Sequence, residues 1–167
     1  MLEAAPPRWW RWLALSAAVC ALDLATKAWV SAAFRLGETR EVTPFFNLVL
    51  WHNPGAAFSF LADAGGWQRW FFIGVTFLVV GMLLGMLRKQ PGNGRLGLAV
   101  GWVIGGALGN LWDRVTLGYV VDFIQLHAAG YYWPAFNVAD SAITIGIMLI
   151  LWDGFRPRPD GAPAPNP

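Results

Sequence analysis

Four long apolar stretches dominate the chain and are separated by shorter segments rich in charge, glycine and proline. Their approximate limits are 10–30, 69–87, 96–112 and 136–152. A helix needs about 20 residues to cross the ~30 Å hydrocarbon core of a bilayer, and the four stretches approach or reach that length. The pattern therefore predicts an α-helical membrane protein with four transmembrane helices.

Composition supports the same class of protein. The chain is 56% hydrophobic and only 13% charged, whereas soluble domains carry about 25% charged residues. Most of the 11 tryptophans flank the apolar stretches, as expected for aromatic belts at the two membrane interfaces. The length of 167 residues indicates a single membrane domain, 1–167. The net charge of +2 gives no reason to expect a nucleic-acid partner.

Basic residues near the ends of the spans indicate the orientation of the chain. They are more numerous on the side of the N-terminus, and the loop between the second and third spans carries Arg88, Lys89 and Arg95 without an acidic residue. Basic residues favour the cytoplasmic side. We therefore expect both termini in the cytoplasm. The expected outer segments are 31–68 and 113–135, and the expected cytoplasmic tail is 153–167.

Two parts of the outer segments alternate like strands. Residues 45–51 are strand-like and end at a turn that contains Asn53 and Gly55, and residues 119–126 alternate in the same way. We expect them to form a small sheet. Residues 56–61 are small and then apolar, which suggests a segment lying on the membrane surface. Asn53 is either a turn residue only or a residue whose amide holds the substrate.

The third span carries Gly97, Gly101, Gly105 and Gly109 at every fourth position. Such a stripe lies on one face of a helix and lets another membrane helix approach closely. We expect tight helix packing there and no further role for these glycines.

Polar side chains interrupt three of the four spans. Asp23, Asn110 and Asp140 lie about 18, 22 and 18 Å from the inner edges of their spans, at a rise of ~1.5 Å per residue. This places all three in the outer half of the bilayer. Polar and ionisable residues inside a span are rare and usually line a functional cavity.

Helical spacing sorts the polar residues into faces. Asp23 and Lys27 are four residues apart, so they either form a simple ion pair within the helix or help to shape the site. Arg114 shares a face with Asn110, and we expect it to be buried and hydrogen-bonded, with Asp113 as a local partner. In the last span, Asn137 precedes Asp140 by three residues and could also cap the helix.

The candidate catalytic residues are Asp122 and Asp140, each in apolar company. A buried carboxylate is costly unless it is paired, hydrogen-bonded or protonated. Two such acids can share one proton and activate water. Each alone could be a turn or capping acid, but together with two asparagines and an arginine they favour a catalytic pair.

Other kinds of site find little support. His52 and His127 have no second histidine or cysteine cluster nearby, which argues against a metal. Ser141 lacks a histidine partner, and no glycine-rich phosphate loop is present, so we expect no cofactor. Cys20 reads as a small buried hydrophobe. An alternative reading of the N-terminus as a cleaved signal is disfavoured by the bulky Val19.

Five motifs occur in order along the chain, and together they resemble a known family. They are DLATK from Asp23, NPGAAFS from Asn53, GNLWDR from Gly109, VVDF from Val120 and FNVADS from Phe136. In these motifs and in its four-span hydropathy the chain is similar to the lipoprotein signal peptidases, the bacterial signal peptidase II family.

The resemblance implies a membrane-embedded aspartic endopeptidase of the bacterial inner membrane. Such an enzyme removes the signal peptide from diacylglyceryl-modified prolipoproteins, cutting just before the lipidated cysteine. The family's catalytic aspartates fall on Asp122 and Asp140. Its supporting polar residues fall on Asn53, Gly55, Asn110, Arg114, Asn137, Asp23 and Lys27. The resemblance also implies a small β-cradle and a surface helix on the periplasmic side, lipid contacts and inhibition by globomycin. We expect a monomer without a metal.

Two other classes of function remain open at this point. Intramembrane acids beside a basic residue also suit a small proton-coupled transporter, although the acids lie near one surface and no repeat is visible. A non-enzymatic membrane scaffold would not need these acids.

Overall fold

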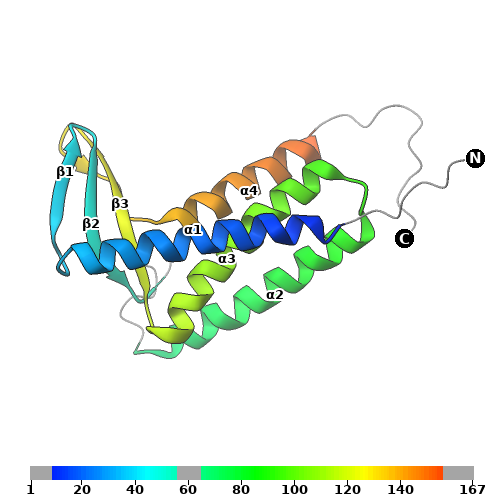
Figure 1. Ribbon diagram of the computed structural model, residues 1–167, viewed down its shortest axis with the longest axis horizontal. Coiled ribbons are helices and arrows are strands. Elements are labelled where there is room, and N and C mark those ends of the chain that lie inside the picture. The colour runs from blue at the N-terminus through cyan, green and yellow to red at the C-terminus, as the bar shows by residue number, and fades with distance from the viewer. Residues whose placement is uncertain (1–8, 56–64, 156–167) are drawn as a thin grey trace, which may run out of the picture.

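The structure is a computed structural model, and it describes residues 9–55 and 65–155. Four long helices run side by side, and a small antiparallel sheet stands at one end of them (Figure 1). The helices are α1 (Arg11–Ala33), α2 (Trp67–Lys89), α3 (Gly94–Thr116) and α4 (Val138–Phe155). A helical membrane protein with a small sheet was predicted, and this architecture is confirmed. Each helix extends beyond the apolar stretch on which it centres at one end or both.

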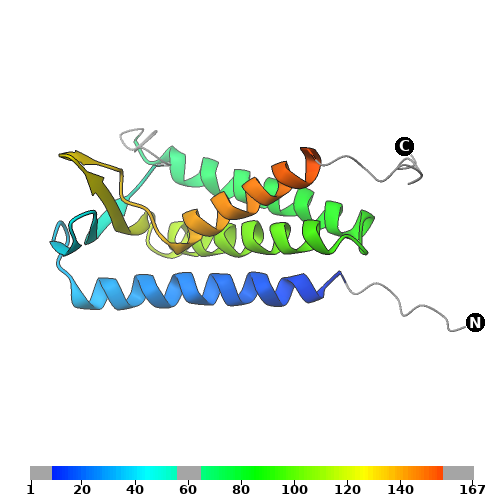
Figure 2. The same cartoon turned by 90° about the horizontal axis from the view of Figure 1, so that it is seen from above.

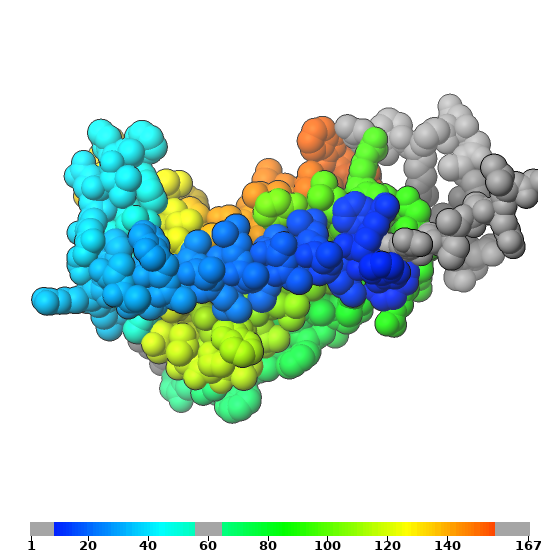
Figure 3. Space-filling model, viewed as in Figure 1, coloured from blue at the N-terminus to red at the C-terminus, as the bar shows by residue number. Residues whose placement is uncertain are grey.

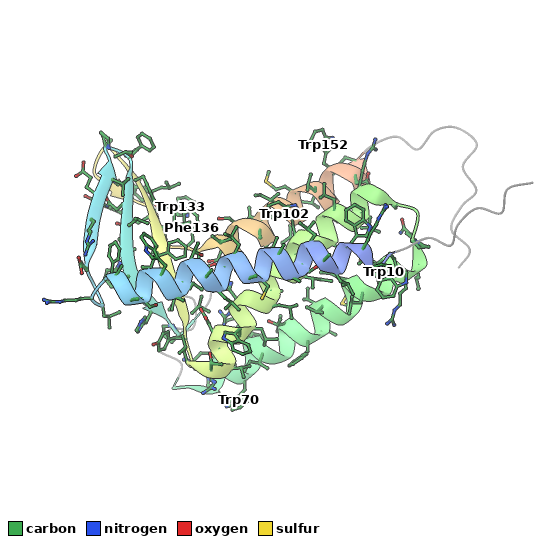
Figure 4. All side chains as sticks on the ribbon, viewed as in Figure 1. Trp10, Trp70, Trp102, Trp133, Phe136 and Trp152 are labelled. Atoms are coloured by element: carbon green, nitrogen blue, oxygen red, sulfur yellow. The ribbon has the colours of Figure 1, made fainter. Side chains whose placement is uncertain are left out.

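Three of the described helices, α1, α2 and α4, are long and apolar enough to cross a membrane. The remaining helix, α3, is as long as α1 and α2 but carries charged and amide side chains. It is buried along most of its length. Large apolar side chains cover the outside of α2 and α4, with Phe77 64% and Met148 66% exposed. Trp10 and Trp152 lie toward the end opposite the sheet, and Trp133 lies beside it (Figure 4).

The helix α3 occupies the centre of the bundle, with α1 on one side and α2 and α4 on the other (Figure 2). The glycine stripe of α3 faces α1, because a Cβ at Gly105 would lie 2.7 Å from the backbone oxygen of Ser16. On the opposite side a Cβ at Gly106 would meet the backbone oxygen of Ala139 in α4. The close helix approach predicted from the glycine spacing is therefore found, and it involves two neighbours of α3.

The sheet is antiparallel with the strand order β1-β2-β3-β4. Its strands are β1 (Thr39–Thr43), β2 (Phe46–Asn53), β3 (Val120–Ala128) and β4 (Tyr131–Tyr132). The predicted pairing of 45–51 with 119–126 is confirmed by β2 and β3, in which Trp51 lies opposite Asp122. Strand β1 was not predicted, because four of its five residues are exposed and no apolar alternation marks it.

An apolar cluster fixes the sheet on the end of α1. Val30 and Phe34 of α1 pack against Leu50 of β2 and against Val121 and Phe123 of β3. This packing holds β3 beside the ends of α3 and α4, so it determines where Asp122 lies. The surface segment predicted for 56–61 lies outside the described residues.

Candidate active site

Asp122 and Asp140 come from different elements and line one cavity. Asp122 lies in β3, Asp140 lies in the first turn of α4, and the cavity between the sheet and the helices has a volume of about 610 Å³. The surface of the molecule is hollowed between the sheet and α4 (Figure 3). Trp133, Phe136 and Ile143 add apolar walls. The cavity therefore combines a polar wall that holds both acids with walls suited to an apolar ligand.

Asp122 is 3% exposed and accepts hydrogen bonds on both carboxyl oxygens. The Asn53 side-chain amide donates to Oδ2 at 3.0 Å, and the Asn137 side-chain amide donates to Oδ1 at 2.7 Å. Burial, and after it the negative charge of Asp140, raise the pKa of Asp122 to about 7. The two amide bonds oppose this shift. Asp122 can therefore carry a proton near neutral pH.

Asp140 is held by the start of its own helix and by α3. The Asn110 side-chain amide donates to Asp140 Oδ1 at 2.8 Å, and the backbone N–H of Asn137 donates to Oδ2 at 3.3 Å. Asn137 Oδ1 in turn accepts the backbone N–H of Asp140 at 2.9 Å, which is an N-terminal helix cap. Asn137 thus performs both roles that its sequence position allowed, because it caps α4 and contacts both aspartates.

Each of the three asparagines is held in one amide orientation. Asn53 Oδ1 accepts the Gly55 N–H at 3.0 Å, and Asn110 Oδ1 accepts from Lys27 Nζ at 2.9 Å. Asn137 Oδ1 is occupied by a backbone N–H as described above. Because each oxygen faces a group that can only donate, each amide nitrogen points at a carboxylate. Asn53 is therefore both a turn residue and a partner of the candidate pair.

Arg114 connects the end of β2 with α3. Its Nη2 donates to the backbone oxygen of Gly55 at 2.8 Å, and its Nη1 donates to that of Asn110 at 3.3 Å. Its guanidinium carbon lies 5.0 Å from the centre of the Phe72 ring, within cation–π range. The buried, hydrogen-bonded role expected for Arg114 is found, and its positive charge lies on the cavity wall.

Lys27 is the centre of a second buried polar cluster. Its ammonium lies 2.8 Å from Asp23 Oδ2 and 3.0 Å from Asp113 Oδ2, and it donates to Asn110. The ion pair within α1 exists, but the reading of a simple intrahelical pair is too narrow because Lys27 also bonds α3. Asp113 was interpreted as a local partner within its own span, whereas the structure pairs it with Lys27.

Asp113 is the one member of this cluster that sequence reasoning did not include among the site residues. It is 3% exposed and accepts the backbone N–H of Val121 at 3.1 Å, so it also holds the start of β3. Its spacing of three residues from Asn110 placed both on one helix face and was the available signal. That spacing does not indicate which residue of another helix Asp113 contacts.

Each histidine stacks on a tyrosine, and His52 also lines a smaller cavity together with Asp122. His52 stacks on Tyr119 with ring centres 3.9 Å apart, and His127 stacks on Tyr132 at 5.2 Å. Within 9–55 and 65–155, no group of three or more metal-ligating side chains comes together. Ser141 lines the cavity, and its hydroxyl donates to the backbone oxygen of Asn137 at 3.0 Å.

All nine residues proposed from the sequence therefore belong to one connected polar network or to its backbone supports. Two carboxyls of unlike surroundings, one buried in a strand and one at a helix N-terminus, can divide the roles of proton donor and proton acceptor. The arrangement suits activation of a water molecule for attack on a carbonyl group.

The comparisons with known proteins agree with this geometry. A sequence model of the family described as signal peptidase (SPase) II matches residues 15–156. The lipoprotein signal peptidase of Aeromonas hydrophila is 53% identical over 149 residues, which is 88% of each chain. That of Azoarcus sp. is 50% identical over 155 residues, covering 91% of this chain and 88% of the relative.

A solved structure is similar in fold as well. It is described as a bacterial membrane enzyme structure determined by the in meso method at 1.9 Å resolution. Its TM-score is 0.77 at 32% identity, over 87% of this chain and 93% of that one. From its motifs, its fold and these relatives, the chain belongs to the signal peptidase II family of membrane proteases.

Proposed function

We propose that this chain removes the signal peptide from diacylglyceryl-modified prolipoproteins, as an aspartic endopeptidase that cuts just before the lipidated cysteine. Family membership supports the reaction. The observation that carries the residue assignment is that Asp122 and Asp140 face one cavity and bond the same residue, Asn137. The shared asparagine holds the two carboxyls in a fixed relation to each other.

Asp140 acts as the base and Asp122 as the acid. Asp140 lies in the first turn of α4, where the helix dipole favours an anion, and Asn110 donates a hydrogen bond to it. Asp122 carries a proton near neutral pH, because burial raises its pKa to about 7. The pair titrates as a unit, so these roles describe its dominant singly protonated form.

The reaction then proceeds without a covalent enzyme intermediate. Asp140 takes a proton from water while the water oxygen attacks the scissile carbonyl, and Asp122 donates its hydrogen to the carbonyl oxygen. When the tetrahedral intermediate collapses, the C–N bond breaks and the leaving amine takes the proton from Asp140. The intermediate's hydroxyl proton returns to Asp122, which restores the starting form. General acid–base catalysis of this kind contributes ~10²–10⁴-fold per group.

The membrane arrangement is part of the same proposal. Each of α1, α2 and α3 has 23 residues, or about 34 Å at the rise of a helix, enough to cross the ~30 Å core. The start of α1, the end of α4 and the α2–α3 connection lie at the end opposite the sheet (Figure 1). That end carries the basic residues Arg88, Lys89 and Arg95, which favours the cytoplasm. All four helices span the inner membrane, both termini are cytoplasmic, and the sheet, a surface helix and the site lie on the periplasmic side.

This placement suits a substrate that is anchored in lipid. The cavity is lined by Ile143 and Ile145 of α4, and Ile145 is 44% exposed on the outside of the bundle. The diacylglyceryl chains stay in the bilayer while the peptide bond enters from the side. Globomycin inhibits by occupying the same cavity, and the active species is a monomer in contact with membrane lipids.

A cleavage assay tests this function directly. The purified wild type is expected to cut a diacylglyceryl-modified precursor peptide, and globomycin is expected to block the reaction. Asp122→Asn and Asp140→Asn should each remove turnover while the protein remains folded in detergent. Asp153→Asn is the matched control, because Asp153 lies at the far end of α4 and pairs with Arg95 at 3.8 Å. Near-normal turnover in either site variant would refute the assignment.

A further inference from the structure

Lys27 has more connections than a residue that only neutralises Asp23 would need. Its side chain is 3% exposed, and three acceptors surround its ammonium: Asp23 at 2.8 Å, Asn110 at 2.9 Å and Asp113 at 3.0 Å. An ammonium has three N–H groups, so this shell can use all of them. Two of the acceptors come from α3, so the lysine fixes α1 to α3 at the depth of the cavity.

The acceptors of Lys27 lead directly to the two proposed catalytic aspartates. Asp23 Oδ1 accepts the backbone N–H of Ala139, the residue before Asp140, at 2.8 Å. Asp113 Oδ2 accepts the backbone N–H of the residue before Asp122, at 3.1 Å. The backbone next to each aspartate is therefore held by one of the two carboxylates that Lys27 neutralises.

The third acceptor makes the connection to a carboxyl group itself. Because Lys27 can only donate, it holds the oxygen of the Asn110 amide, and the nitrogen of the same amide must face Asp140. That nitrogen donates to Asp140 Oδ1 at 2.8 Å. Without the lysine the Asn110 oxygen keeps only a longer hydrogen bond, from the Asn137 side-chain amide at 3.3 Å. Less then opposes a rotation that would turn this oxygen toward the carboxylate and convert an attraction into a repulsion.

We propose that Lys27 is a positioning residue for the catalytic pair, holding the backbone beside both aspartates and the orientation of the Asn110 amide. This rests on the proposed function, because it takes Asp122 and Asp140 as the reacting acids. Lys27 touches neither of them and acts through Asp23, Asp113 and Asn110.

The charge of Lys27 also contributes to the ionisation of the pair. The other titratable or charged groups around it are Cys20 and Asp23 on α1, Asp113 and Arg114 on α3, Asp122 on β3 and Asp140 on α4. The positive charge of Lys27 lowers the pKa of Asp122 against the larger effect of burial. Removing it leaves the carboxylates of Asp23 and Asp113 without their cation, so ionisation of the catalytic pair becomes harder.

Two substitutions with opposite electrostatic signs separate this role from a merely structural one. Lys27→Met removes the positive charge, so the acid limb of the pH profile for kcat should move to higher pH. Asp113→Asn removes a negative charge, so the limb should move to lower pH. Its contacts can persist, because Asp113 Oδ2 accepts from both Lys27 and a backbone N–H, and the Asn carbonyl can replace that oxygen.

The experiment measures kcat and KM against pH for the full chain in detergent, with the diacylglyceryl-modified peptide as substrate. For Lys27→Met we expect kcat to fall about 100-fold while KM changes less than about twofold, because the reacting groups are misplaced and substrate contacts remain. Ser16→Ala is the matched control. Ser16 is also buried on α1 and donates to the Gly101 backbone oxygen of α3 at 3.0 Å, far from the cavity. Its pH profile should match the wild type.

The outcomes are distinct. An unchanged kcat and pH profile for Lys27→Met, or shifts of the same sign in Lys27→Met and Asp113→Asn, would overturn the positioning role. If Lys27→Met does not fold, the test is the direction in which Asp113→Asn moves the acid limb of the pH profile. A move to lower pH supports the positioning role, and no move or a move to higher pH overturns it. Activity retained in Asp122→Asn or Asp140→Asn would instead overturn the proposed function itself, so the two failures are distinguishable.

Discussion

The side-chain amide of Asn137 donates to Asp122 at 2.7 Å, and no other hydrogen bond to that carboxylate is shorter among those described. Its orientation is fixed, because the other end of the amide accepts the N–H of Asp140. Asn137→Asp keeps a good helix cap but replaces the donor by a second carboxylate. We expect kcat to fall by about 100-fold or more with only a small change in Tm.

Asn137→Ser provides the comparison for that variant. Serine also caps helices well but lacks the amide that reaches Asp122. Both variants should unfold near the Tm of the wild type, because the helix cap is kept. Both should cleave the substrate more slowly, because the donor to Asp122 is lost. A serine variant with wild-type kcat would show that the Asn137–Asp122 contact is dispensable.

Replacing each of the two acids that neutralise Lys27 by asparagine should destabilise the protein to a different extent. Asp23 uses one oxygen for Lys27 and the other for the Ala139 N–H, so both of its oxygens face donors. In Asp23→Asn the NH₂ group must face one of these donors, and a buried donor is left unsatisfied. We expect a loss of about 1–3 kcal/mol in the free energy of unfolding.

Asp113→Asn should be less costly, because a single oxygen accepts both of its contacts. The check is the Tm of both variants in the same detergent. Equal destabilisation of the two would contradict this difference.

Gly109 marks the tightest point between α1 and α3 at the level of the site. A Cβ there would collide with the carboxylate of Asp23, and 3.3 Å separates it even from the Asp23 Cβ. Gly109→Ala should therefore displace Asp23 and lower both Tm and kcat. Gly81→Ala on α2 is the matched control, because a Cβ there meets nothing within 4 Å. We expect it to be neutral or slightly stabilising, since alanine favours the helix. Similar Tm losses in both variants would indicate a general intolerance of alanine.

The raised pKa of Asp122 predicts how activity depends on pH. In the proposed mechanism Asp122 must be protonated to donate to the carbonyl oxygen, and burial raises its pKa to about 7. Cleavage should therefore decline as pH rises above about 7. A kcat that stays constant well into the alkaline range would contradict the assignment of Asp122 as the acid.

The same shift predicts a change in stability. The folded pKa lies above the usual value of 3.8, so the folded state binds the proton more tightly than the unfolded state does. This stabilising contribution is complete below 3.8 and is lost as pH rises to about 7. Asp122→Asn cannot ionise, so the difference in Tm between the variant and the wild type should shift in favour of the variant with rising pH. A difference that does not change with pH would contradict a raised pKa.

The sequence alone determined the helices, the two central strands and the candidate residues. An apolar stretch long enough to cross a bilayer and a period-two alternation are both local patterns of neighbouring residues. The helices and strands that they indicate can therefore be predicted without knowing any tertiary contact. The glycine spacing of α3 likewise predicted that a neighbouring helix approaches closely. Five ordered motifs indicated the family, and the resemblance made Asp122 and Asp140 the candidate catalytic residues.

Only the tertiary structure decided which polar groups meet. Lys27 and Asn110 are 83 positions apart, and Asp23 reaches a backbone N–H 116 positions away. Helical spacing assigns each of these residues to a face, but the partner depends on how the helices are rotated and packed. The pairing of Lys27 with Asp113, and the backbone N–H groups held beside each aspartate, follow from that packing, because hydrogen bonds form only where distance and direction agree within a few tenths of an ångström.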